Sequence, residues 1–186
     1  MLGMTNIQLI AHGLVLLGTV IVVIGMQQKK YGQIVLCKIT NEFLAAVHYM
    51  LLGGWTGMAA NFASCITNGV YWYRIKKGKS TLVFQIIFGA MFVGIGLLSW
   101  HGPVSLFVIA AKLVSSASLG IKNPKIIRIL NLISNPCWLM YNIFMGSYAA
   151  MITDLAITGS ALVGLIRLDI LKEEPKQKVS KNPHHS

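Results

Sequence analysis

The chain has 186 residues, of which 55% are hydrophobic and only 11% are charged, and it carries a formal net charge of +11. A soluble domain carries about 25% charged residues, and a chain of this length could not bury seven apolar segments of about 20 residues in a water-soluble core. The composition therefore predicts an integral membrane protein. It argues against nucleic-acid binding, because the basic residues lie in short loops and form no basic face interleaved with aromatic residues.

Seven apolar segments follow one another, and each is long enough to cross a bilayer as a helix. They are expected at residues 7–26, 34–52, 58–73, 81–99, 104–121, 127–145 and 148–166. The first segment has no positively charged leader, so we expect a retained span rather than a signal peptide. The charged end of the chain is expected to form a disordered tail.

The basic residues are distributed unevenly between the loops. The loops after the first, third and fifth segments, together with the tail, carry 14 of the 16 Lys and Arg residues, and the other loops carry none. Cytoplasmic loops of multi-pass membrane proteins are enriched in Lys and Arg. We therefore expect the N-terminus to lie outside and the C-terminus to lie in the cytoplasm.

An internal repeat relates the two halves of the chain. A shift of 93 residues places residues 34–74 on residues 127–167. The equivalent pairs include Lys38 and Asn131, Glu42 and Asn135, Tyr49 and Asn142, Gly53 and Gly146, and Asn61 and Asp154. The first three segments match the last three, and the fourth is left over. Because that extra crossing restores the chain direction, the two triplets should be parallel and related by an axis along the membrane normal.

We therefore predict an all-α membrane protein with seven transmembrane helices, arranged as two parallel triple-helix bundles joined by a linker helix. The expected division is a first bundle at 1–80, a linker helix at 81–100, a second bundle at 101–170 and a cytoplasmic basic tail at 171–186.

Polar residues recur along one face of several segments. Inserting an ionisable group at the centre of a bilayer costs about 2.5–3.5 kcal/mol, so such groups usually have a functional or structural role. Glu42, Lys112 and Asp154 lie well inside their segments. The sixth segment carries polar and aromatic residues at intervals of 4, 3 and 4, which is the spacing of one helix face: Asn131, Asn135, Trp138 and Asn142. We expect these faces to point inward.

The candidate site is a polar path between the two triplets. Asn61 and Asp154 are expected to face each other across the axis and to hydrogen-bond a polar solute, and Trp138 would offer a flat surface for stacking. The further candidates on this path are Glu42, Asn135 and Asn142. The alternative is that these side chains only join helices, since amides and hydroxyls between membrane helices contribute about 0.6–2 kcal/mol each.

Three further residues are candidates for charge pairing or gating. Lys112 is expected to pair with Glu42 or Asp154. Lys38 could form a gate or carry a proton together with Glu42, or it could extend along its helix to the interface. Pro136 interrupts the sixth segment, where it could be a hinge or a static kink.

Two resemblances to known families support this interpretation. The segments HYMLLGGWTGMAAN and PCWLMYNIFMGS, together with Asp154 and a terminal GLIR, resemble the YgjV family of bacterial inner-membrane proteins over about residues 5–170. The 3+1+3 arrangement of spans also resembles the SWEET and PQ-loop transporters. That resemblance implies that the polar pair on the third and seventh spans, Asn61 and Asp154, faces a central substrate path. Because the Pro-Gln dipeptide is missing, sugar specificity does not carry over.

Sequence motifs typical of enzymes and of metal sites are missing. There is no nucleophile elbow, phosphate-binding glycine loop or HExxH motif, and the cysteines and histidines lack metal-ligand spacing. We expect no enzyme, no cofactor and no metal site.

The functional prediction is a transporter of a small polar solute by alternating access between the two triplets. The alternative is a non-transporting scaffold that binds a partner or lipid through its basic inner face. The expected partners are the lipid bilayer and an unidentified polar solute, without nucleic acid, and a homo-oligomer is left open.

Overall fold

The computed structural model describes residues 6–51, 55–98, 100, 102–144 and 148–171. These ranges contain no strand and form α1 (Asn6–Met26), α2 (Tyr31–Leu51), α3 (Trp55–Lys76), α4 (Leu82–Leu98), α5 (Ser105–Leu119), α6 (Pro124–Phe144), α7 (Tyr148–Leu165) and a π-helical turn η1 (Ile166–Ile170). The all-α prediction is confirmed, and each helix lies on one predicted segment. The equivalent glycines of the repeat, Gly53 and Gly146, and most of the predicted tail lie outside the described residues.

The helices differ in how apolar they are. Asn6–Met26, Tyr31–Leu51 and Met151–Ile170 are long and apolar enough to cross a membrane, and α4 and α5 are apolar but shorter. α3 and α6 have 22 and 21 residues but carry more polar side chains. Many of these are buried inside the molecule: Ser64, Thr67, Asn68, Arg128, Asn131, Ser134, Asn135 and Asn142. The lower hydropathy of α3 and α6 thus comes from faces that point inward.

The outer surface of the molecule is apolar. Every α-helix presents large hydrophobic side chains that are more than half exposed, among them Leu9, Leu36, Ile66, Ile86, Leu106, Ile133 and Ile152. A water-soluble monomer rarely exposes contiguous apolar surface on this scale. The polar-inside, apolar-outside distribution is the one expected in lipid.

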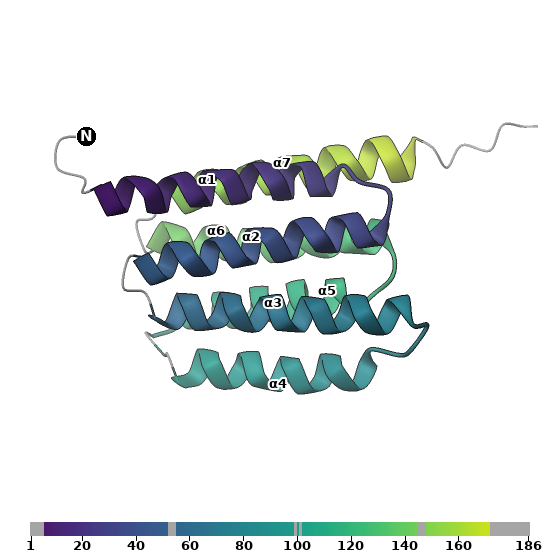
Figure 1. Ribbon diagram of the computed structural model, residues 1–186, viewed down its shortest axis with the longest axis horizontal. Helices are drawn as coiled ribbons and strands as arrows, with labels where there is room; N and C mark the ends of the chain where they lie inside the picture. Colours follow the sequence, from purple (N-terminus) through teal and green to yellow (C-terminus); the bar gives the residue numbers. More distant parts are fainter. Residues whose placement is uncertain (1–5, 52–54, 99, 101, 145–147, 172–186) are drawn as a thin grey trace, which may run out of the picture.

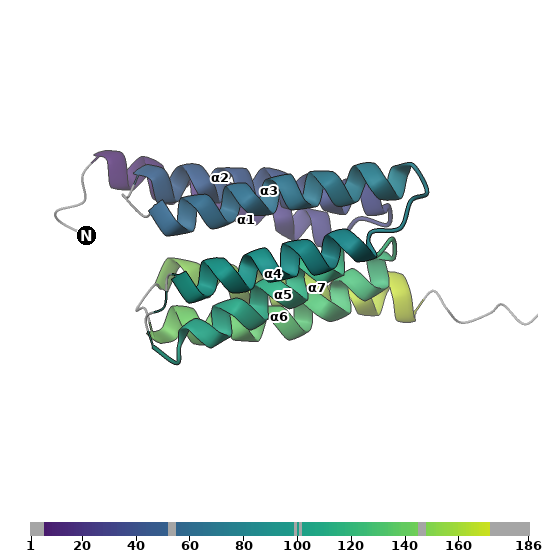
Figure 2. The same cartoon turned by 90° about the horizontal axis from the view of Figure 1, so that it is seen from below.

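The helices form two facing rows, shown from two sides in Figures 1 and 2. In the first row α2 lies between α1 and α3, and in the second row α6 lies between α7 and α5. α1 packs against α7 and α3 against α5, so α2 and α6 face each other in the middle. The linker α4 lies beside α5 and α3 at one end of the rows.

The two triplets run in the same direction. Figure 1 shows α1, α3, α5 and α7 all crossing the molecule in one direction and α2, α4 and α6 in the other. A half-turn about an axis between α2 and α6 exchanges α1 with α5, α2 with α6 and α3 with α7, as the sequence repeat requires. The predicted parallel arrangement is therefore confirmed. The division into domains near residues 80 and 101 stays a prediction.

One hydrogen bond marks where this axis passes. Lys38 Nζ donates to Asn131 Oδ1 at 2.8 Å, and these residues are 93 positions apart. They are equivalent in the repeat, and equivalent residues related by a two-fold axis can touch only near the axis itself. The middle of the molecule, between α2 and α6, is therefore the place where both triplets contribute the same positions.

One end of the molecule is both basic and closed by apolar packing. It carries the loops at 27–30, 77–81 and 120–123, which include Lys29, Lys30, Lys77, Lys79 and Lys122. We refer to it as the basic end. A cluster of buried apolar residues lies toward it: Tyr31, Ile34, Val35, Tyr71, Ile75, Leu119 and Ile127. Because this cluster draws on α2, α3, α5 and α6, it joins the two rows there.

Candidate functional site

A cavity of about 320 Å³ lies between the two rows. Its wall is formed by all six helices of the triplets, and the linker α4 contributes no lining residue. Eight of the nine candidates from the sequence line it: Lys38, Glu42, Asn61, Lys112, Asn135, Trp138, Asn142 and Asp154. Its size is at the lower end of the range typical of small-molecule sites. The remaining candidate, Pro136, lies inside α6 without lining the cavity, and its role as a hinge stays a prediction.

Four polar residues of the wall were not singled out by the sequence, namely Asn41, Ser115, Ser134 and Thr153. Asn41 and Ser134 are themselves equivalent in the repeat, so their shared polarity was a signal that could have found them. Ser115 and Thr153 have apolar equivalents in the other triplet, and the repeat gave no signal for either.

The cavity also has two histidines in its wall, His12 and His48. His48 Nδ1 lies 2.9 Å from the carbonyl oxygen of Ala11, which joins α2 to α1. His48 therefore takes part in packing α2 against α1.

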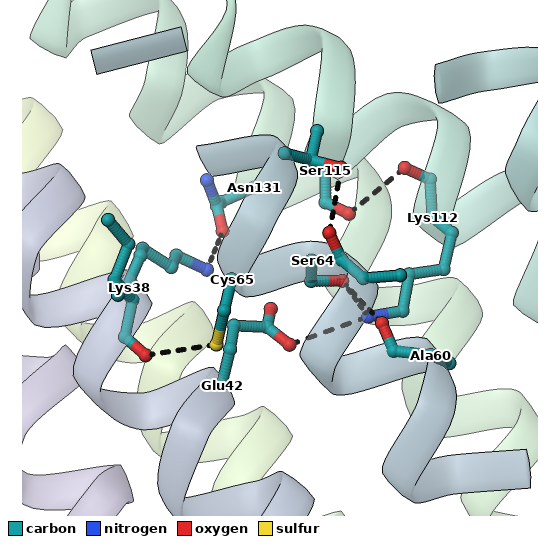
Figure 3. Close-up of polar contacts among 11 residues, drawn as sticks. Lys38, Glu42, Ala60, Ser64, Cys65, Lys112, Ser115 and Asn131 are labelled. Carbon is teal, nitrogen blue, oxygen red and sulfur yellow. Dashed lines mark hydrogen bonds and ion pairs between the residues drawn. The ribbon is translucent and has the colours of Figure 1, made fainter. Parts of the chain in front are cut away.

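Lys38 is turned toward the axis and not toward the membrane interface. Its side chain is 9% exposed, and its ammonium group donates to Asn131 (Figure 3). Asn131 Nδ2 in turn donates to the carbonyl oxygen of Ile127 at 2.7 Å, which leaves Oδ1 directed at Lys38. The alternative that Lys38 extends to the interface is therefore wrong. A hydrogen-bond acceptor on the facing helix holds the ammonium group inside the molecule.

Lys112 joins α5 to the opposite row. Its Nζ lies 3.5 Å from Glu42 Oε2 and donates to Ser64 Oγ at 2.8 Å (Figure 3). Of the two partners that the sequence left open, the structure gives Glu42. The ammonium group also lies 5.4 Å from the ring centroid of Trp138, within the range of a cation–π contact. Lys112 is thus held by an ion pair, a hydroxyl and an aromatic ring.

Asp154 is bound within its own row. Asn142 Nδ2 donates to Asp154 Oδ2 at 2.7 Å, which joins α6 to α7, and both residues are buried. Asn61 lines the same cavity from α3. The sequence paired Asp154 with Asn61, and the structure adds Asn142 as the direct partner of the carboxylate. Their role in binding a solute stays a prediction.

The family model described as bacterial inner membrane protein, Imp-YgjV, matches residues 9–172. The chain belongs to this family. No match was found among curated proteins or among solved structures. Membership in the Imp-YgjV family and the apolar helices together identify an integral inner-membrane protein. The likeness to SWEET and PQ-loop transporters stays a prediction.

One buried donor of this Imp-YgjV protein has no acceptor in the part of the chain that the structure describes. Asn135 is 5% exposed, and its Nδ2 makes no hydrogen bond to any described residue. An unsatisfied buried group costs about 1–3 kcal/mol, so native structures keep few of them. Asn135 lies in the wall of the cavity, one helical turn from Asn131.

Arg128 joins several elements at the basic end of this Imp-YgjV protein. Its side chain is 1% exposed, Nε donates to the carbonyl oxygen of Met26 at 2.8 Å, and Nη1 donates to Asp169 Oδ2 at 2.6 Å. Nη2 donates to the carbonyl oxygen of Gln28. The guanidinium group therefore ties α6 to the end of α1 and to the turn that follows α7.

The other triplet makes an equivalent connection. Tyr31 OH donates to the carbonyl oxygen of Leu119 at 2.6 Å. Leu119 and Met26 are equivalent in the repeat and are the last residues of α5 and α1. Each of these carbonyls accepts a hydrogen bond from the other row. Both of these equivalent bonds therefore join the two rows at the basic end.

The sequence missed Arg128 as a structural residue, because it directly follows a basic loop and was counted with it. The available signal was its position three residues before Asn131, on the same face of α6. Within the described ranges, no three His, Cys, Asp or Glu side chains come together in a way that could hold a metal ion.

Proposed function

We propose that this protein is a transporter, not an enzyme, and that it moves a small polar solute across the bacterial inner membrane by alternating access. The observation that carries the proposal is the cavity of about 320 Å³ between the two rows. It surrounds the axis that relates the triplets, which is where transporters built from repeats bind their substrates.

The charged residues in the cavity wall support the same function. Lys38, Lys112 and Asp154 are each less than a tenth exposed, and ionisable groups buried within a membrane protein are expensive to keep. Such groups commonly mark the path of a solute or an ion. A scaffold that only bound a partner or lipid through its basic end would gain nothing from charged groups around an internal space.

The contacts at the basic end suggest how access is controlled. The positive-inside rule assigns this end to the cytoplasm, which would leave the N-terminus outside. The bonds of Arg128 and Tyr31 join the two rows at this end, and we propose that they close the route from the cavity to that side. Rocking of the rows would break these bonds and open the cavity to the cytoplasm.

A binding screen followed by uptake tests the proposal. The purified protein in nanodiscs is heated with sugars, vitamins and amino acids, and a binder raises the melting temperature because it stabilises only the folded state. We expect at least one class of solute to do so, and to enter proteoliposomes faster than it enters empty liposomes. If no solute either raises the melting temperature or enters faster than the control, the transporter proposal is contradicted.

A matched pair of variants on α7 connects uptake to the cavity. Asp154→Ala removes the carboxylate from the cavity wall, and we expect uptake to fall by about tenfold or more. Leu155→Ala is the control, because Leu155 is 57% exposed on the lipid-facing surface. Equal uptake by the two variants would contradict a role of the cavity in transport.

A further inference from the structure

We infer that the cavity binds a small zwitterion, with its anionic group at Lys38 and its cationic group at Asp154. The inference rests on the proposed function for the location of the site, and it adds the chemical class of the solute. It follows from the charges, the hydrogen-bonding capacity and the spacing of the residues in the cavity wall.

The charges of the cavity are only partly compensated. Lys112 and Glu42 form an ion pair with each other. Lys38 and Asp154 have amides as their side-chain partners, Asn131 and Asn142 respectively, and neither makes an ion pair within the described part of the chain. An amide does not neutralise a charge, and a buried charge without an ion-pair partner in contact with it is costly. A solute with one group of each sign would compensate both.

The free hydrogen-bonding capacity is also divided between two positions. The ammonium group of Lys38 has three donors, of which Asn131 takes one. Asn135 Nδ2, which has no acceptor among the described residues, lies one turn along α6. The carboxylate of Asp154 has about four acceptor positions, of which Asn142 takes one. Donors therefore remain at one position and acceptors at the other.

The spacing of the two amide partners shows that the two positions lie apart along the cavity wall. Asn131 and Asn142 are 11 residues apart on α6, which corresponds to about 16 Å along the helix. Trp138 lies between them on the same face and lines the cavity. Its ring offers an apolar surface for a carbon chain. The two charges of the solute should therefore be separated by several carbon atoms, and not carried on adjacent atoms as in glycine.

Matched probes test the inference on the full chain in nanodiscs. The zwitterion is 6-aminohexanoate, hexanoate lacks the cation, 6-aminohexanamide lacks the anion, and glycine has both charges close together. Binding is measured by titration calorimetry at constant ionic strength. We expect 6-aminohexanoate to bind about tenfold more tightly than each of the other three, because only it can pair with both buried charges.

Two variants then test which residue binds the anionic group of the solute and which binds its cationic group. Lys38→Met should remove the advantage of 6-aminohexanoate over 6-aminohexanamide, and Asp154→Asn should remove its advantage over hexanoate. Lys29→Met, in the exposed loop after α1, is the control and should change nothing. The melting temperature without a probe verifies that each variant is folded, and the comparison of probes on the unaltered protein needs no variant.

Several results would overturn the inference. These are equal binding of the zwitterion and a singly charged probe, no binding of 6-aminohexanoate, or the same loss for all probes in Lys38→Met. Binding and uptake separate this inference from the proposed function. Binding of 6-aminohexanoate without uptake of any solute would support the zwitterion site and contradict transport. Uptake of an uncharged solute without zwitterion binding would support transport and contradict the zwitterion site.

Discussion

At the scale of single residues, Lys112 shows why the charged groups of the cavity depend on one another. It is 8% exposed, and its ammonium group is held by Glu42, by Ser64 and by the ring of Trp138. Removing one partner of a buried ion pair leaves an uncompensated charge, whereas replacing both with apolar residues is often nearly neutral. The pair therefore makes a prediction about stability that is independent of transport.

We expect Lys112→Met to lower the free energy of unfolding by about 3 kcal/mol, since the carboxylate of Glu42 loses its counter-charge. The double variant Lys112→Met with Glu42→Leu should recover most of this loss. Reversible unfolding in mixed micelles measures both, with Lys122→Met in the exposed loop as the control. A single variant as stable as the unaltered protein, or a double variant no better than the single, would argue against the ion pair.

Much of the site was predictable at this scale because polar residues in lipid are rare and their spacing reveals their face. Asn131, Asn135 and Asn142 fall on one face of α6, and all three line the cavity. The pairing of Asp154 with Asn142 was not predictable, because the sequence does not say which rotamers meet. Arg128 was missed because, beside a basic loop, the sequence does not distinguish a buried arginine from an exposed arginine of a cytoplasmic loop.

At the scale of helices, the contact between α7, α1 and α6 depends on Gly164. A Cβ atom at Gly164 would lie 2.6 Å from the carbonyl oxygen of Met26 and 3.0 Å from Arg128 Nε. The first atom belongs to the backbone and cannot easily move away. A side chain at this position would therefore separate α7 from α1 and disturb the bonds of Arg128.

We expect Gly164→Ala to destabilise the protein by about 1–3 kcal/mol through overpacking. Gly159 on the same helix is the matched control, because no described atom beyond its own stretch of helix lies within 4 Å of its Cβ position. Gly159→Ala should be neutral or stabilising by up to about 1 kcal/mol, since alanine favours the helix. Melting curves of the two variants test this prediction. Equal changes in melting temperature would show that α7 does not pack as described.

The helices themselves were predicted well, and their neighbours were not. Long apolar segments and basic loops define where each helix begins and ends, so α1, α2 and α6 match the expected spans within a few residues. The repeat and the linker α4 predicted the parallel direction of the triplets. The arrangement as two rows was not predictable, because hydropathy identifies a buried face without identifying the helix that covers it.

At the scale of the whole molecule, two parallel rows enclose polar and charged groups and present an apolar surface outward. The cavity lies where the repeat brings equivalent positions together, as the contact between Lys38 and Asn131 shows. Toward the basic end, Arg128 and Tyr31 bind the rows to each other. The central claim of this account is that the cavity becomes accessible from each side of the membrane in turn.

Labelling of a single cysteine in the cavity tests this claim most directly. Ala45 lines the cavity from α2, and Ala45→Cys is made with Cys37, Cys65 and Cys137 changed to serine. A membrane-impermeant thiol reagent is applied to right-side-out and inside-out vesicles, with Leu97→Cys on the lipid-facing surface of α4 as the control. We predict labelling of Ala45→Cys from both sides, with faster labelling from the cytoplasm when Asp169→Asn weakens the hold on Arg128. Labelling from neither side, or from one side only in both backgrounds, would contradict the account.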